Sequence, residues 1–219
     1  MRGLIIAGII AAATAWLVTA ASPAETMENK PMMEMGRDGG AQMALKNDMR
    51  KLWEDHITWT RNYIVSALAG LDDVNAVAGR LLKNQDDIGD AIKPYYGEDA
   101  GKKLASLLRD HILIATEVVS AAKSGKSDDL TKAQAKWTAN ADDIAAFLSG
   151  ANPNWPKAEM TEMLHKHLEY TTAEVTSRLK KDWPADIEAY DKGHMHMLMF
   201  ADKLSDGIIK QYPQKFMAM

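Results

Sequence analysis

The sequence predicts an all-α protein: an up-and-down helical bundle of about six helices arranged as three repeated antiparallel hairpins. From Ala44 onward, apolar residues recur at helical spacing, and no segment alternates apolar and polar residues as a strand would. Similar segments return about every 55 residues, which indicates that the domain is built from repeated units. The connections between the expected helices are short, and short connections favour antiparallel neighbours.

The first hairpin is predicted from two amphipathic patterns, over about 44–70 and 73–93. The Pro94–Gly97 segment then breaks the chain. A third helix is expected over about 99–124. Gly125 ends it, because glycine readily adopts the left-handed conformation that closes a helix C-terminus.

Caps and prolines delimit the other three helices. Ser127 or Asp128 can cap a fourth helix, which ends before the Gly150–Pro156 turn. A fifth helix follows this turn and runs to about Lys181. Pro184 lies in the first turn of the sixth helix, where its missing N–H costs nothing, and the next proline ends that helix.

Residues 1–24 have the pattern of a targeting segment. Arg2 precedes an apolar run from Leu4 to Val18, and small residues follow at Ser22 and Ala24. This pattern predicts a signal peptide that is removed on export. An uncleaved N-terminal anchor is the alternative, because the apolar run approaches membrane-spanning length. The protein is therefore expected outside the cytoplasm, secreted or in the cell envelope, and on a membrane only if the segment stays uncleaved.

Three further ranges complete the expected organisation: a disordered methionine-rich linker over 25–43, the helical bundle domain over 44–213, and a C-terminal tail over 214–219. The linker methionines offer thioether sulfur, which favours Cu(I), although methionine is equally permitted in a disordered tail. Three of them, Met32, Met33 and Met35, lie close together in the sequence.

Charge and motifs exclude several classes of function. The formal net charge is −4 and no basic stripe is present, so we expect no nucleic-acid partner. The chain has no glycine-rich phosphate-binding loop, so we expect no nucleotide partner either. No catalytic motif identifies an enzyme, and the chain has no cysteine for a disulfide.

A histidine recurs at one position of the repeat. His56, His111 and His167 each lie on the apolar stripe of the first helix of a hairpin, near the middle of its length. On the sixth helix, the apolar stripe places His194 at the same height, whereas strict repeat spacing selects His196 instead.

The second helices of the first two hairpins carry a matching asparagine at this height, Asn84 and Asn140. Imidazole is a ligand for zinc, copper and iron, so the layer is a candidate transition-metal site. Two carboxylates share the inward faces, and the asparagines would orient the imidazoles from outside the ligand set. The candidate metal ligands are His56, His111, His167, His194, Glu174 and Asp191.

Three interpretations of this polar layer stay open. It binds a transition metal ion; or it is only packing, in a structural or interaction protein of the cell envelope; or it lines a catalytic cavity without metal, in an enzyme of unknown reaction.

Residues spread over about 50–213 also carry a resemblance. They are Leu52-Trp53, His56, Trp59-Thr60-Arg61, Tyr96-Gly97, Asp110-His111, Asn140-Ala141-Asp142, Asn152-Pro153 and Gly207-Ile208. In this combination the chain resembles a family of uncharacterised, exported, all-helical bacterial proteins from bacilli and clostridia. Some members are labelled glycosyltransferase, an activity that needs an α/β nucleotide-binding framework. The resemblance implies a helical fold and no established mechanism or functional residue.

Overall fold

The computed structural model describes residues 32–217 of the chain, which form a helical unit. Its elements are α1 (Met32–Ala69), α2 (Val74–Tyr96), α3 (Glu98–Ser124), α4 (Ser127–Ala151), α5 (Lys157–Leu179), α6 (Trp183–Gln211) and the short 3-10 helix η1 (Pro213–Phe216). No strand occurs within this range, so the all-α prediction is confirmed. The expected signal segment 1–24, residues 25–31 of the expected linker and the end of the expected tail lie outside the described residues.

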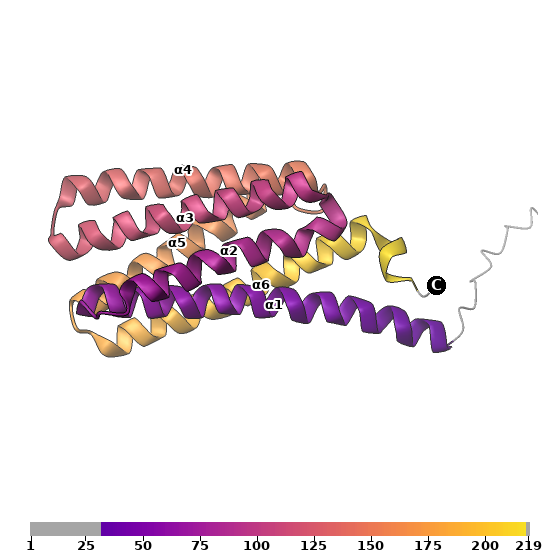
Figure 1. The fold of residues 1–219 in the computed structure, drawn as a ribbon, viewed down its shortest axis with the longest axis horizontal. Coiled ribbons are helices and arrows are strands. Elements are labelled where there is room, and N and C mark those ends of the chain that lie inside the picture. Colours follow the sequence, from indigo (N-terminus) through magenta and orange to yellow (C-terminus); the bar gives the residue numbers. More distant parts are fainter. Residues whose placement is uncertain (1–31, 218–219) are drawn as a thin grey trace, which may run out of the picture. The chain divides into compact units, whose positions relative to one another are not determined.

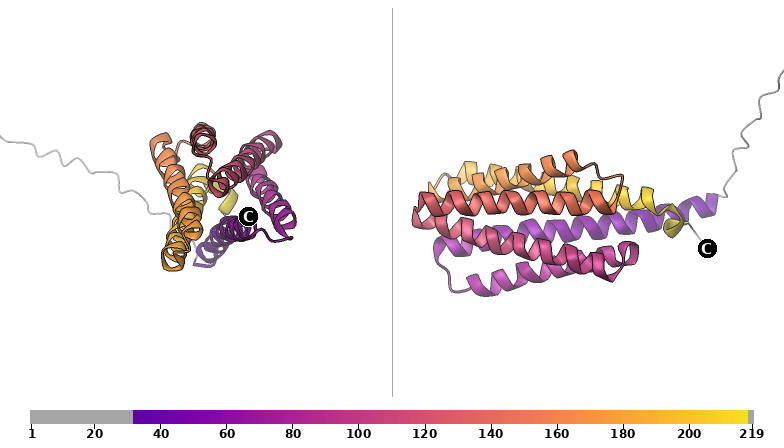
Figure 2. Two further views of the ribbon diagram at one scale, coloured as in Figure 1. Left: turned by 90° about the vertical axis from the view of Figure 1, so that its left-hand side faces the viewer. Right: turned by 90° about the horizontal axis from the view of Figure 1, so that it is seen from above.

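The six helices close into a ring. Each helix packs against the next one in sequence, and α6 packs against α1 (Figure 1). The end-on view in Figure 2 shows the helices arranged around a common interior. The hairpins are α1–α2, α3–α4 and α5–α6, so their first helices alternate around the ring with their second helices. This is the predicted up-and-down bundle.

The turn inside each hairpin repeats one backbone conformation. Gly70, Gly125 and Lys181 all have positive φ, of 71°, 70° and 60°. They follow one another at the spacing of the repeat. The third hairpin thus has a lysine where the other two have glycine, in a conformation that costs a residue with a Cβ about 1 kcal/mol. The predicted closure of the third helix by Gly125 is present, and its N–H donates to the carbonyl of Ala122.

Helix α1 begins before its expected start. It extends upstream to Met32, so the described part of the expected linker, 32–43, is helical. Burial on the bundle begins only at Leu45 and Met49. The upstream turns continue from this packed part, because each residue added to an existing helix gains one hydrogen bond without a new nucleus.

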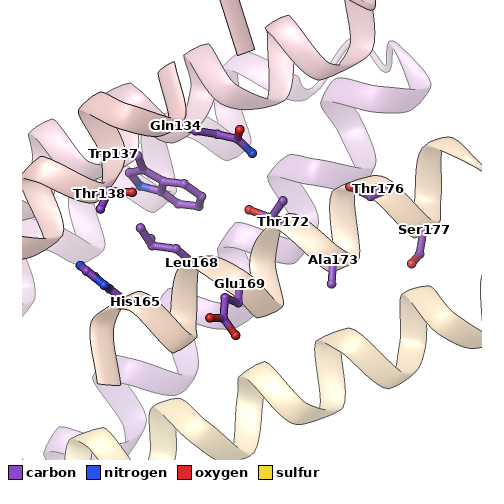
Figure 3. A pocket seen from close by; sticks show the side chains of 10 residues that line it. All are labelled: Gln134, Trp137, Thr138, His165, Leu168, Glu169, Thr172, Ala173, Thr176 and Ser177. Atoms are coloured by element: carbon purple, nitrogen blue, oxygen red, sulfur yellow. The ribbon is translucent and has the colours of Figure 1, made fainter. Parts of the chain in front are cut away.

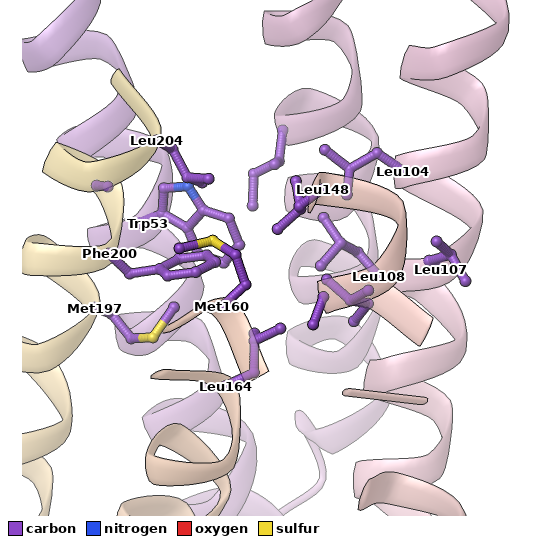
Figure 4. Packing of buried hydrophobic residues seen from close by; sticks show 14 of the residues in the cluster. Trp53, Leu104, Leu107, Leu108, Leu148, Met160, Leu164, Met197, Phe200 and Leu204 are labelled. Atoms are coloured by element: carbon purple, nitrogen blue, oxygen red, sulfur yellow. The ribbon is translucent and has the colours of Figure 1, made fainter. Parts of the chain in front are cut away.

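The core is stacked in layers of equivalent residues from α1, α3 and α5. Figure 4 shows part of it, with the Phe200 ring meeting the Trp53 ring edge-on at 5.0 Å between centroids. Inside the bundle, two apolar layers lie on one side of the histidines and one smaller apolar layer lies on the other side. The three apolar layers are Met49, Leu104 and Met160; Trp53, Leu108 and Leu164; and Ile64, Val119 and Val175.

Helices α2 and α3 cross at a pair of glycines. A Cβ added to Gly89 would lie 2.5 Å from the carbonyl oxygen of Gly101, and one added to Gly101 would lie 2.7 Å from the carbonyl oxygen of Gly89. These two positions exclude any side chain because the backbones approach so closely. None of the helices in the described range is both long and apolar enough to span a membrane.

Candidate functional site

Three buried imidazoles meet inside the ring. His56 on α1, His111 on α3 and His167 on α5 are each only 2% exposed. The ring centroids of His56 and His167 lie 5.5 Å apart, and those of His111 and His167 lie 5.9 Å apart. The repeat thus brings together the three histidines that the sequence placed at one height.

A matching hydrogen bond joins the two helices of every hairpin at this layer. A polar side chain on the second helix donates to a backbone carbonyl on the first, four residues before the buried histidine. The bonds run from Asn84 to Leu52 (3.0 Å), from Asn140 to Leu107 (3.1 Å) and from His196 to Met163 (2.7 Å). His196 is therefore the third-hairpin counterpart of the two predicted asparagines.

The expectation that His194 belongs to the interior layer is wrong. Its side chain is 26% exposed, and its Nε2 lies 3.2 Å from a carboxylate oxygen of Glu54. The apolar stripe that favoured His194 was taken to consist of Ile187, Leu198, Ala201 and Ile208. It was centred incorrectly, since Ile187 is 53% exposed. Strict repeat spacing, which selected His196, gave the correct orientation.

His111 has both ring nitrogens engaged. Its Nδ1 lies 2.8 Å from the side-chain oxygen of Asn140, so Nδ1 carries the proton and donates. Its Nε2 accepts from the indole N–H of Trp137 at 3.1 Å. In this arrangement His111 is neutral and has no free lone pair for a ligand.

His56 has a less complete set of partners. Its Nδ1 lies 3.3 Å from the amide nitrogen of Gln85, which also approaches the Leu81 carbonyl at 2.8 Å and the Asn84 side-chain oxygen at 3.1 Å. An amide nitrogen has only two protons for these three acceptors. Of the three acceptors, the Nδ1 of His56 lies farthest from the amide nitrogen of Gln85.

Four buried polar atoms on residues near His56 have no protein partner. They are Trp53 Nε1, Thr60 Oγ1, Gln85 Oε1 and His167 Nδ1. The Trp53 ring meets the His56 ring at 5.5 Å, and Thr60 is one helical turn beyond His56 on α1. An unpaired buried polar group costs about 1–3 kcal/mol, so such a concentration calls for a physical explanation.

The other two hairpins show that the fold does not need these polar groups. The positions equivalent to Trp53, Thr60 and Gln85 are apolar in the second hairpin. In the third hairpin one is a threonine whose hydroxyl donates to the His167 carbonyl at 3.0 Å. The equivalents are Leu108, Ala115 and Ala141 in the second hairpin, and Leu164, Thr171 and Met197 in the third. The sequence analysis missed this difference, which a residue-by-residue alignment of the hairpins would have found.

Burial keeps the imidazoles neutral. It lowers the pKa of His56 to about 3 and that of His111 to about 4, because an apolar interior disfavours the charged ring. The pKa of His167 also lies well below its usual value, first through burial and then through repulsion from His56 and His111. At neutral pH the layer offers uncharged donors and acceptors only.

A small cavity lies about one helical turn beyond the histidines, and none of the three lines it. Its wall includes Thr60, Thr171 and Ala115, each one helical turn beyond a buried histidine, and also Trp137. Its volume of about 20 Å³ has room for one water molecule. The unpartnered hydroxyl of Thr60 is therefore beside space that one water molecule can occupy.

The two predicted carboxylate ligands lie elsewhere. Asp191 is exposed on α6. Glu174 is buried, but its carboxylate binds Arg61 at 2.8 Å. Burial raises the pKa of Glu174 to about 7, against the opposing effect of Arg61. Arg61 also binds the buried Asp186, and sequence reasoning missed both of these residues.

Burial would raise the pKa of Asp186, but its ion pairs with Arg61 and Arg178 outweigh burial, so this pKa lies below its usual value. Within the described residues, no three histidine, aspartate or glutamate side chains are placed to hold a metal ion. The side chains of Met32, Met33 and Met35 lie outside the described part of the structure.

Searches against protein-family models, curated proteins and solved structures found no match to this chain.

Proposed function

We propose that the protein binds a small, uncharged, hydrogen-bonding molecule inside the bundle, at the histidine layer around His56. One observation carries the proposal: the first hairpin surrounds His56 with unpartnered buried polar atoms at positions that are apolar in the second hairpin. A bound molecule would supply the missing partners. The expected signal segment, 1–24, supports binding outside the cytoplasm as part of this proposal.

The chemistry of the unpartnered atoms favours a molecule that both donates and accepts hydrogen bonds. Trp53 offers an N–H donor, Gln85 a carbonyl acceptor, and Thr60 a hydroxyl that can do either. The depressed pKa values of the imidazoles support an uncharged ligand, because a charge in this interior would have no opposite charge beside it.

A transition metal ion, such as zinc, copper or iron, is the second candidate ligand. It is favoured by the ring centroids of His56 and His111, which each lie within 6 Å of that of His167, and by the free Nδ1 of His167. Binding an ion would require the rings to turn, and His111 would have to release the Trp137 N–H. The indole N–H of Trp137 donates to His111 within the layer and disfavours a cation there.

The decisive experiment removes two unpartnered groups without removing any existing hydrogen bond. We expect the double variant Trp53→Phe/Thr60→Ala to lose the small molecule that wild-type protein, purified without a histidine tag, releases on denaturation. Removing each unpartnered group favours the fold by up to about 1–3 kcal/mol. The smaller ring at position 53 leaves a gap in the core that opposes this gain, so without ligand the variant should be about as stable as wild type. Mass spectrometry of the released molecules and thermal melts provide the two measurements.

Thr171→Ala is the matched control, because Thr171 occupies the position equivalent to Thr60 and its hydroxyl already has a partner. It should retain the bound molecule. Stoichiometric metal in the wild type that is lost in His167→Leu would overturn the proposal in favour of the second candidate. Absence of both molecule and metal would leave the layer as packing, in a structural or interaction protein of the cell envelope.

A further inference from the structure

An open groove lies on the outside of the bundle between α4 and α5 (Figure 3). Its volume is about 640 Å³. Most of its polar lining is hydroxyl and amide, including Gln134, Thr138, Thr176 and Ser177, and Trp137 and Leu168 are apolar parts of its surface. The imidazole of His165 and the carboxylate of Glu169 also line it. No lysine or arginine is among the side chains described along this groove, so it does not favour an anion.

Only a thin wall separates this groove from the small cavity beyond the histidines. Trp137 and Thr172 each line both spaces. The indole of Trp137 is 3% exposed, its ring centroid lies 5.2 Å from that of His111, and its N–H donates to His111 Nε2. One side chain therefore closes the cavity on its groove side and occupies a ring nitrogen of the layer.

The repeat again marks this position as unusual. The residue equivalent to Trp137 is Leu81 in the first hairpin and Gly193 in the third. Leu81 also lines the cavity, but it does not line the groove. A large indole with a hydrogen-bonding N–H is thus present at the one equivalent position where the cavity meets an outer groove.

We propose that the groove between α4 and α5 is the entrance to the histidine layer, and that Trp137 is the side chain that closes it. This inference rests on the proposed function and adds the route by which the ligand arrives. The hydroxyl and amide lining fits a small uncharged molecule bearing hydroxyl or amide groups, which would first bind in the groove. Turning the indole away would join the groove to the cavity and free His111 Nε2 for the arriving molecule.

Acylation of histidine by diethyl pyrocarbonate tests the route without knowledge of the ligand. The reagent attacks neutral imidazole, and peptide mass spectrometry assigns the modified residue. In wild type, His111 and His167 should react slowly and the part-exposed His165 rapidly. In Trp137→Leu, we expect His111 and His167 to react at least about tenfold faster, because the wall is removed and reaction no longer waits for local opening.

Two further variants separate an opened wall from a loosened interior. Trp137→Phe removes the N–H but keeps a ring in the wall, so both histidines should stay slow. Leu81→Ala enlarges the same cavity without opening the groove, and should also leave them slow. Circular dichroism checks that each variant is folded. Equal acceleration in all three variants, or none in Trp137→Leu, would overturn the entrance while leaving the ligand test at Trp53 and Thr60 unaffected.

Discussion

At the scale of single residues, the layer holds three imidazoles that burial keeps uncharged. A proton on any one of them would place a charge in an apolar interior, beside two other imidazoles. Unfolding exposes the same rings to water, where each takes up a proton near its ordinary pKa of 6.5. The layer therefore ties the stability of the fold to pH.

We expect stability to fall as the pH drops from about 6.5 towards 4, because the unfolded chain then binds protons that the folded layer cannot. For His111, with its pKa at about 4, the loss is at most about 3 kcal/mol. Glu174 acts in the opposite direction: its pKa of about 7 makes the folded state bind its proton more readily over the same range. Scanning calorimetry at a series of pH values, in a Glu174→Gln background, isolates the histidine effect.

The control for this prediction is the exposed imidazole of His165, which pairs with Asp142 at the surface. His165→Asn should leave the fall in stability between pH 6.5 and 4 unchanged, whereas His111→Leu should make that fall smaller. A curve that shows no loss of stability between pH 6.5 and 4 in the Glu174→Gln background would contradict the burial argument.

The positions of His56, His111 and His167 were predictable because they follow the apolar period of long helices. The shell around His56 was not predicted, although Trp53, Thr60 and Gln85 are all visible in the sequence. Apolar periodicity indicates which side of a helix each residue faces. It does not compare the side chains at equivalent positions of the three hairpins.

At the scale of helices, the crossing of α2 and α3 depends on the absence of side chains at one point. Gly89 and Gly101 bring the backbones together next to the tight connection at Gly97. The residue equivalent to Gly89 is alanine in the other two hairpins, Ala145 and Ala201, and each of these is fully buried. The contact at this point of the ring is therefore closer than the repeat alone requires.

Gly89→Ala should destabilise the protein by about 1–3 kcal/mol, because the new methyl group meets backbone that cannot move aside without separating the helices. Gly79→Ala on the same helix is the control. Nothing lies within 4 Å of a Cβ there, so the change should stabilise by up to about 1 kcal/mol through helix propensity. Urea unfolding monitored by circular dichroism measures both, and equal effects at the two positions would contradict the close approach.

Helix number, order and approximate ends followed from apolar spacing and from the residues that interrupt it. The start of α1 was not predicted correctly. A helix can extend from its packed segment into the methionine-rich linker, because propagation is not stopped by a change in composition. The 3-10 helix η1 was also missed. Phe216 is buried there, with its ring 5.9 Å from Tyr95, in a segment that was expected to be a tail.

At the scale of the whole bundle, closure of the ring depends on the seam between α1 and α6. Arg61 on α1 binds both Glu174 on α5 and Asp186 on α6, and Arg178 binds Asp186 at 2.9 Å. Both carboxylates are buried. This ionic cluster joins the first helix of the chain to the last hairpin, contacts that no local pattern in the sequence could have predicted.

Arg61→Met should destabilise the protein by about 3–5 kcal/mol, because it leaves Glu174 without its cation in the interior. Arg50→Met is the matched control at the same seam. Arg50 is half exposed and pairs with Asp202, so its loss should cost less than about 1 kcal/mol. Chemical unfolding of both variants measures the loss in the free energy of unfolding. Comparable losses would mean that the buried cluster contributes no more to stability than a surface ion pair.

The closed ring also limits how this architecture can grow. Repeat proteins that stack in an open row can lengthen by duplication, since each new unit touches only its neighbour. Here every hairpin contributes one imidazole to a shared centre. A fourth hairpin would widen the ring and draw those imidazoles apart. The copy number is therefore fixed by the interior rather than by the ends, and divergence is confined to substitutions within the three units, as has happened around His56.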